Sequence, residues 1–415
     1  MIRDAGVVEK GDVERIDDPS AFADLREEWN ELLAASRADC LFLSWEWLHT
    51  WWTHLAGRRQ LCLQLVRCGR ELAAIAPLVQ RLPAWRRLIP FRALEFLGTG
   101  IVGSDYLDVI VRSGREQEAL DALAEALAET NLTLEFGQVR RSVSSVAPLT
   151  QRLAARGWNE FEAPASACPV IDFAGRSWES YLGSLSSAHR YNFQRRLKNL
   201  DRRYNTRLEL VQTEAERRVA LDALVALHTH RWDTRGGSEV FGSPALLAFH
   251  DEMSRLALQR GWLRLFVLRL DGRPAAVLYG YRYGRTFYFY QSGFDPALAK
   301  ESVGLVTMGL TIRHAITEGA AEYDLLHGLE PYKFHWMPEV RELAHLELFP
   351  PGPRGAVCRG IAMASGRIRR GARHLLGDAV AERIVSRGWG GLAGTLGTVR
   401  AAWRRGAGEN ALPRP

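Results

Sequence analysis

The apolar positions in the first third of the chain change from the spacing of a helix to the spacing of a strand and back. Residues 20–36 and 44–55 repeat apolar side chains at the helical period behind a serine that can cap the first turn. The apolar runs after them are short and separated by turn residues, which is typical of strands. The pattern predicts these two helices, strands at 61–68, 71–80, 92–98 and 106–111, a helix at 116–129 and a strand at 131–139.

The same order of elements then begins again. The pattern predicts helices at 177–203, 214–231, 244–260 and 303–318, and strands at 263–270, 275–283, 286–294, 322–328 and 343–350. Two Gly-Arg pairs, at 69–70 and 272–273, lie between predicted strands and are 203 positions apart. We therefore predict a degenerate tandem repeat of one α/β (α+β) unit, in domains 1–165 and 166–350, each with a mixed central sheet.

The formal net charge of +6 is concentrated at one end of the chain. Residues 351–415 hold twelve Arg and no Lys against Asp378, Glu382 and Glu409, a local charge of +9, so the first 350 residues sum to −3. This tail is expected to be helical or disordered. We expect it to attach the protein peripherally to anionic lipid of the inner membrane, and a solvated extension is the alternative.

Composition favours a soluble globular protein, because 47% of the residues are hydrophobic and 25% are charged. No apolar run is long enough to span a bilayer, and the first residues lack the apolar stretch of a secretory signal. The five cysteines are an odd number without a C-x-x-C pair, which predicts reduced thiols in a cytoplasmic protein.

A second basic cluster lies between residues 190 and 207, where seven Lys and Arg face a single Asp201. It fits a solvated helix face, a collar for an anionic acceptor such as a nucleotide sugar, or a contact to tRNA. Arg190 and Arg195 are the candidates for acceptor binding. Because the first 350 residues sum to −3, nucleic acid is the least favoured partner and tRNA a minor alternative.

The predicted strand at 286–294 leads into a loop of small residues and then into the helix at 303–318. Unpaired backbone N–H groups and the positive end of the helix dipole favour a pyrophosphate at such a place. The candidates for holding it are Lys300, Ser302, Val303 and Gly304. An ordinary serine cap without a ligand is the alternative at this position.

Six ordered segments between about residues 40 and 350 together resemble the GNAT superfamily. They are FLSWEWLHTWW, SSAHRYNFQRRLKNL, LHTHRWDTRGG, YQSGFDP, KESVG and YDLLHGLEPYKFHW. Within the superfamily they are similar to BioF2-like and CelD (BcsL)-type acetyltransferases, which are related to the FemAB aminoacyltransferases. The glycine-rich GNAT loop is incomplete, since Ser302-Val303-Gly304 stands where relatives often have Ser-Pro-Gly.

The resemblance implies two GNAT-like copies, of which only the second holds acetyl-CoA or another acyl-CoA as donor. It places the donor pyrophosphate at Lys300–Gly304. It places the thioester carbonyl on backbone groups of Gln291, Ser292 and Gly293, where the strand separates from its neighbour in GNAT folds. Lys333 is implied to bind a phosphate of the acceptor, with an exposed loop lysine as the alternative. In the first copy, residues 103–108 carry two acids and no base, so we predict that this copy binds no donor and is structural or binds the acceptor.

The catalytic candidates are His228, Asp324 and Tyr332. His228 is a base with a pKa near neutrality, although a histidine of the core or surface fits as well. Asp324, in a predicted buried strand, is either a perturbed carboxylate or a hydrogen-bonded structural acid. His228 and His230 lie on different faces of a helix, so no metal site is expected.

The function expected from these features is transfer of an acyl group from acyl-CoA to the nitrogen or oxygen of a cell-envelope or exopolysaccharide precursor, an anionic sugar or amine. A Fem-like transferase that uses aminoacyl-tRNA and a non-catalytic accessory factor of polysaccharide synthesis are the alternatives. Fold alone does not decide among them, because GNAT folds serve many acceptors.

Overall fold

The computed structural model describes residues 11–83, 92–233, 240–336 and 338–376. The first half of the chain forms β1 (Asp12–Ile16), α1 (Pro19–Asp24), α2 (Arg26–Ala34), α3 (Trp45–Leu55), β2 (Gln60–Leu61), β3 (Leu63–Cys68), β4 (Glu71–Ala76), β5 (Leu78–Arg81), β6 (Ala93–Phe96), β7 (Ile110–Val111), α4 (Glu116–Thr130), β8 (Thr133–Val139) and α5 (Val146–Ala154). The second half forms β9 (Asn159–Asp172), α6 (Trp178–Ser184), α7 (Ser187–Arg203), β10 (Thr206–Leu210), α8 (Glu214–Asp233), α9 (Pro244–Gln259), β11 (Leu263–Leu270), β12 (Arg273–Tyr283), β13 (Thr286–Phe294), the 3-10 helix η3 (Pro296–Glu301), α10 (Val303–Thr317), β14 (Glu322–Asp324), α11 (Pro331–Phe334), β15 (Glu339–Phe349) and α12 (Pro353–Leu376).

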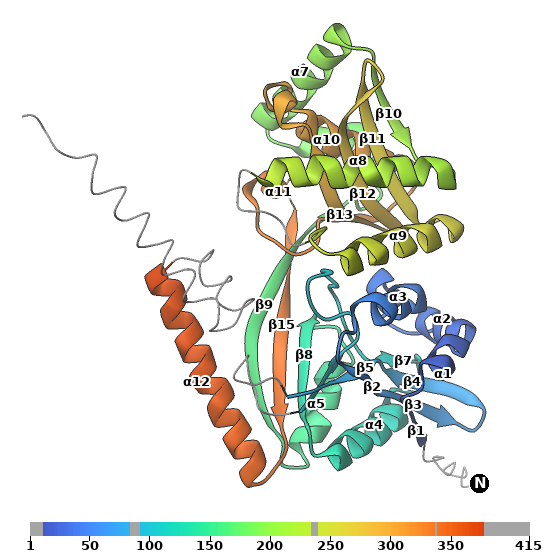
Figure 1. Ribbon diagram of the computed structural model, residues 1–415, viewed down its shortest axis with the longest axis vertical. Helices are drawn as coiled ribbons and strands as arrows, with labels where there is room; N and C mark the ends of the chain where they lie inside the picture. The colour runs from blue at the N-terminus through green and yellow to red at the C-terminus, as the bar shows by residue number, and fades with distance from the viewer. Residues whose placement is uncertain (1–10, 84–91, 234–239, 337, 377–415) are drawn as a thin grey trace, which may run out of the picture.

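The predicted α/β architecture is confirmed, with an antiparallel sheet in the first half and a larger mixed sheet that spans both halves. A four-stranded sheet has the order β1-β3-β4-β7, and an eleven-stranded sheet has the order β10-β11-β12-β13-β14-β9-β15-β8-β6-β5-β2. The long strands β9 and β15 pair antiparallel and run from one half into the other (Figure 1). The predicted domain boundary at 165/166 therefore falls inside a paired strand and not in a loop.

The two predicted repeat hairpins exist, but their correspondence differs by one residue from the Gly-Arg alignment. The strands of the first hairpin close at Cys68–Glu71 and those of the second at Leu270–Arg273, an offset of 202. Each hairpin also has an irregularity in its register at the matching place, after Val66 in the first and after Leu268 in the second. The turns differ, because a Gly-Arg turn in one hairpin corresponds to an Asp271-Gly272 turn in the other. An alignment that matches the two glycines therefore shifts the strands by one residue.

The second half of the large sheet is covered on both faces. Helices α8 and α9 pack against one face of β12 and β13, where Gly293 approaches α8 so closely that an added Cβ would lie 2.8 Å from the His228 backbone nitrogen. Helix α10 covers the other face, and its Met308 and Ile312 join Phe287 and Phe289 in one apolar cluster. Figure 1 shows α8 in front of the sheet and α10 behind it. A side chain on α8 is therefore separated from α10 by the sheet.

The chain after β15 forms α12, which agrees with the helical form expected for the start of the tail. Arg359 on this helix donates to Asn159 Oδ1 of β9 at 3.1 Å. The remainder of the predicted basic tail, 377–415, lies outside the described residues. Among the helices that the structure describes, none combines the length and the apolar character needed to cross a bilayer.

Candidate active site

Strands β13 and β14 begin as a parallel pair and then separate. Their last paired residues are Tyr288 and Asp324, after which β13 continues to Phe294 while the chain leaving β14 turns towards α11. On its other edge β13 stays paired with β12, so that Gln291 is opposite Tyr279. The separation predicted at Gln291, Ser292 and Gly293 is therefore present, and β13 has no strand partner on that side beyond Tyr288 within the described residues.

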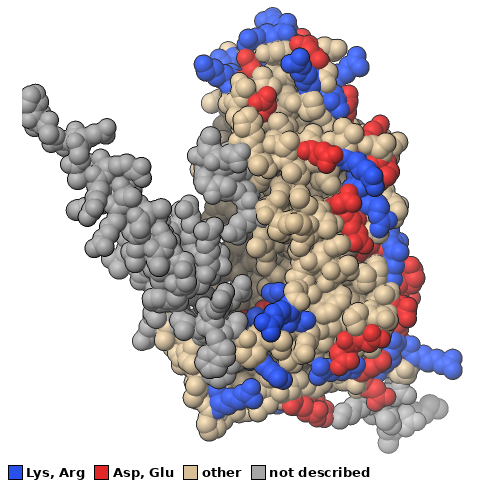
Figure 2. Space-filling view, in the orientation of Figure 1, with Lys and Arg blue, Asp and Glu red and all other residues tan. Residues whose placement is uncertain are grey.

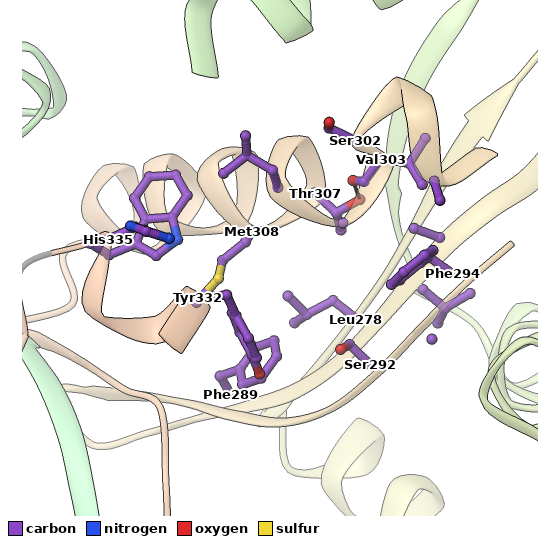
Figure 3. Close-up of a pocket in the computed structure, with 17 residues that line it drawn as sticks. Leu278, Phe289, Ser292, Phe294, Ser302, Val303, Thr307, Met308, Tyr332 and His335 are labelled. Carbon is purple, nitrogen blue, oxygen red and sulfur yellow. Dashed lines mark hydrogen bonds between the residues drawn. The ribbon is translucent and has the colours of Figure 1, made fainter. Parts of the chain in front are cut away.

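A cavity of about 240 Å³ lies between the separated part of β13 and α10. Of the predicted site residues, its lining includes Ser292, Gly293, Ser302, Val303, Gly304 and Tyr332, and it leaves out Gln291 and Lys300. Figure 3 shows α10 along one side, the strand residues Leu278, Phe289 and Phe294 opposite, and His335 at one end. The predicted donor loop and the predicted strand segment thus meet at one mainly apolar cavity.

Sequence reasoning missed most of the apolar lining. Phe289 and Phe294 on β13, Thr307 and Met308 on α10, and Trp336 beyond α11 all border the cavity. Positions 303, 304, 307 and 308 share one face of α10 because the helix repeats every 3.6 residues. That spacing is the signal in the sequence that could have added Thr307 and Met308 to the candidates.

The amino terminus of α10 is chemically open. Ser302 precedes the helix in the left-handed region, with φ of 59°, and its side chain caps no backbone N–H. The first turn of α10 has no acidic residue, whereas α4 of the first half has Glu116 and Glu118 there. The positive end of the α10 dipole is thus available for an anion, while the positive end of the α4 dipole already faces the carboxylates of its own first turn. This contrast supports the prediction that only the second copy binds a donor.

The basic cluster lies on α7, beside this helix terminus. Arg196 donates to the Lys300 carbonyl oxygen at 2.8 Å, and Arg203 donates to Glu301 at 2.7 Å. Figure 2 shows Lys and Arg gathered at the end of the molecule where α7 lies. The predicted acceptor ligands Arg190 and Arg195 are not brought into the cavity: the first donates to the Gly183 carbonyl and the second contacts Asn192 and the Tyr191 ring.

His228 is not placed to act as the base of this cavity. It is buried on α8 and lies edge to face with the Phe241 ring at 5.0 Å. Because α8 and α10 cover opposite faces of the sheet, the sheet separates His228 from the cavity. Helical periodicity identified the helix correctly but could not give the face of the sheet on which it packs.

Lys333 has a structural role in this part of the fold. Its ammonium is buried and donates to the carbonyl oxygens of Leu326, His327 and Gly328 at 3.3, 2.9 and 3.1 Å. Glu330 lies 2.9 Å from the same nitrogen. An ammonium has three protons to donate, and these partners use them. The alternative of an exposed loop lysine is therefore wrong, and the predicted phosphate would have to compete with these protein oxygens.

Asp324 is a buried acid with both carboxyl oxygens hydrogen bonded. Oδ2 accepts from the Tyr106 hydroxyl at 2.7 Å and Oδ1 accepts from the Leu326 backbone at 2.8 Å. Burial raises its pKa to about 7. It borders a second, polar pocket of about 160 Å³ between the halves, which Arg37, Arg140 and Arg341 also line. Asp324 is thus a hydrogen-bonded buried acid with a raised pKa, and its catalytic role stays a prediction.

The described residues contain no group of three or more His, Cys, Asp or Glu side chains that could hold a metal ion. His228 is buried and His230 is exposed, as expected for neighbours two positions apart on a helix.

Residues 187–334 match the model of the family described as "Acetyltransferase (GNAT) domain". The match runs from the start of α7 to the end of α11 and so includes the α10 amino terminus, the separated strands and all of the cavity lining except His335 and Trp336. No curated protein matches the chain.

Two solved structures resemble both halves together. FemX has a TM-score of 0.58 and 13% identity over 81% of this chain and 96% of its own. A conserved protein of unknown function from Bacteroides thetaiotaomicron has a TM-score of 0.51 and 14% identity over 81% of this chain and 99% of its own. Residues 187–334 therefore match a GNAT acetyltransferase domain, within a two-half fold that resembles the fold of FemX.

Proposed function

We propose that this protein transfers an acyl group from acyl-CoA to an amine or hydroxyl of a cell-envelope or exopolysaccharide precursor. The observation that supports it best is the cavity between β13 and α10. It has mainly apolar walls, suited to a pantetheine arm, and it reaches the amino terminus of α10, where a pyrophosphate would find unpaired N–H groups. The separated edge of β13 offers backbone donors for the thioester carbonyl, whose oxygen becomes negative in the transition state.

The acceptor is proposed to approach from the opposite face of the sheet. The polar pocket there is lined by three arginines and by four acids, Asp39, Asp108, Glu322 and Asp324. Arg341 pairs with Glu322, whereas no ion pair of Arg37 or Arg140 is present among the described residues. An anionic group of a sugar that also carries an amine or hydroxyl would complement these two arginines. The envelope class of acceptor rests on the resemblance to FemAB-type proteins and on the fold shared with FemX.

Titration calorimetry of the full chain with acetyl-CoA tests the donor site. Gly304→Glu places a carboxylate in the cavity at the positive end of α10, and we expect it to weaken acetyl-CoA binding at least about tenfold. Gly183→Glu is the matched control, because it adds the same charge at an exposed helical glycine with open space around it, and it should leave affinity unchanged. Absence of binding to the wild type, or equal binding to Gly304→Glu, contradicts the proposed donor site.

A Fem-like transferase that takes its aminoacyl group from tRNA is the second candidate, favoured by the FemX fold and by the arginines of α7. Binding of aminoacyl-tRNA at low salt, with no binding of acetyl-CoA, would replace the proposed donor by this one. The α8 and α9 helices lie on the sheet and do not project as a separate helical pair.

We further propose that the protein is cytoplasmic and touches the inner membrane through residues 351–415, whose local charge is +9. Each basic residue near an anionic surface contributes about 1 kcal/mol. The full chain should co-sediment with vesicles containing phosphatidylglycerol at low salt, and a variant with six of the twelve arginines changed to glutamine should not. Equal sedimentation of the two proteins would contradict attachment through this segment.

A further inference from the structure

A loop of the first half crosses the gap between the separating strands of the second. The Tyr290 hydroxyl, on β13, donates to the Val102 carbonyl at 2.6 Å. Four residues later in the loop, the Tyr106 hydroxyl donates to Asp324, the last residue of β14, at 2.7 Å. Residues 102–106 therefore border the gap on the face opposite α10, where the acceptor is proposed to approach.

This loop places a buried carboxylate against a histidine of the second half. Asp105 has no exposed surface, and each of its oxygens lies 3.0 Å from His327 Nδ1. The His327 backbone N–H also donates to Asp105 at 3.0 Å, and so does the Gln138 side chain. A carboxylate only accepts hydrogen bonds, so Nδ1 carries the proton and Nε2 carries the lone pair when the ring is neutral.

The ring is held in position but remains open to a substrate. The His327 side chain is 45% exposed, and Nε2 has no hydrogen-bond partner among the described residues. At Gly103, whose φ is 71°, an added Cβ would lie 3.0 Å from His327 Cε1, so the ring packs where only glycine fits. Lys333 fixes the backbone by donating to the His327 carbonyl at 2.9 Å.

Three charged groups face the imidazole. Asp105, from the loop of the first half, raises the pKa of His327 through its hydrogen bond and charge, and Glu330 raises it further. Burial and the ammonium of Lys333 lower it. The net direction of the pKa is upward from 6.5, so the neutral form of His327 becomes common only at a higher pH than for an ordinary histidine.

We infer that His327 is the general base of this transferase and that Asp105, supplied by the donor-free half, is its positioning residue. The inference rests on the proposed function. The acceptor nitrogen or oxygen attacks the thioester carbonyl carbon, the new C–N or C–O bond forms, and the C–S bond breaks. His327 Nε2 takes the proton that leaves the acceptor and then returns a proton to the thiolate sulfur, so that amide or ester and free thiol are the products.

The arrangement also gives the first half a specific task. Two acids at residues 105 and 108 were predicted to oppose a pyrophosphate, and the structure uses them differently. Asp108 accepts from the backbone N–H groups of Val109, Ser145 and Val146 at 2.8 to 3.1 Å, which fixes the protein's own chain. Asp105 instead completes a site in the other half.

The test measures thiol release from acetyl-CoA with protein in excess, using the anionic amino sugar glucosamine 6-phosphate as the probe acceptor, between pH 5.5 and 9. His327→Gln should lower the rate about 10²- to 10⁴-fold with acetyl-CoA affinity by calorimetry unchanged. Asp105→Asn should lower it less and shift the acid limb of the profile to lower pH. The matched control is His345→Gln, a half-exposed histidine that lies 3.3 Å from Glu347 on β15 and away from the site, and it should keep the wild-type rate.

The outcomes distinguish between the two proposals, the pair of His327 and Asp105 (the dyad) and the acetyl-CoA donor site. If acetyl-CoA binds but the wild type releases no thiol at pH 9, or if His327→Gln stays within threefold of wild type, the dyad is overturned while the donor site stands. If acetyl-CoA does not bind, the proposed function and the dyad fail together. NMR of the His327 ring gives a second measurement: a neutral ring protonated at Nε2, or a pKa unchanged by Asp105→Asn, also overturns the pair.

Discussion

Replacing Trp47 with alanine is expected to lower the free energy of unfolding by about 3–5 kcal/mol, the range for a large aromatic side chain removed from a core. The indole is fully buried, and its Nε1 donates to Ser104 Oγ at 2.8 Å. Four rings lie edge to face with it at centroid distances from 4.9 to 5.9 Å, and they belong to Phe42, Phe249, Tyr281 and Tyr290. Because Phe42 and Ser104 come from one half and the other three residues from the second, the cavity left by alanine would open the contact between the halves.

Urea unfolding of the purified chain measures this loss. Trp52→Ala on the same helix is the matched control, since Trp52 is only partly buried, and it should cost less than half as much. A Trp47→Ala loss below about 1 kcal/mol would show that the halves are held by other contacts. Trp47→Phe adds a functional readout: it fills most of the space but leaves Ser104 without its donor, next to Asp105. It should therefore shift the pKa of His327, while the free energy of unfolding falls much less than in Trp47→Ala.

The elements of this fold are readable from the sequence, and its contacts across the sheet are not. Alternation and turn residues located β11, β12 and β13, and the serine before residue 303 marked the start of α10. The separation of β13 from β14 was expected from the resemblance, and the structure places it after Tyr288. Periodicity shows which side of an element is apolar but not which face of a sheet it covers, which is why His228 was placed at the wrong site.

Contacts between residues that are distant in the chain could not be predicted for the same reason. Asp105 and His327 are separated by 222 positions, and no local pattern connects them. The charge of the acidic segment at 103–108 led only to the prediction that the first half binds no donor. The repeat was detected with an error of one residue, because glycine marks a turn but its place within the turn differs between the hairpins.

The second large effect is expected at Lys333, where Lys333→Met should cost about 3–5 kcal/mol of unfolding free energy. Methionine fills similar space but leaves the three carbonyls of residues 326–328 without their donor, and each buried unsatisfied group costs about 1–3 kcal/mol. The affected turn already contains unusual backbone, with φ of 55° at Leu326 and 109° at Gly328. Hydrogen exchange should therefore increase there first.

Lys198→Met, at an exposed lysine of α7, is the control and should change stability by less than about 0.5 kcal/mol. A lysine that bound acceptor phosphate would behave in the opposite way, because its removal would relieve charge and leave stability intact while acceptor binding fell. If Lys333→Met is as stable as the wild type, the structural role of the buried Lys333 is refuted, and the predicted role in binding phosphate is favoured instead. If it unfolds early and residues 325–330 exchange faster, Lys333 acts on catalysis only through His327, whose carbonyl it holds.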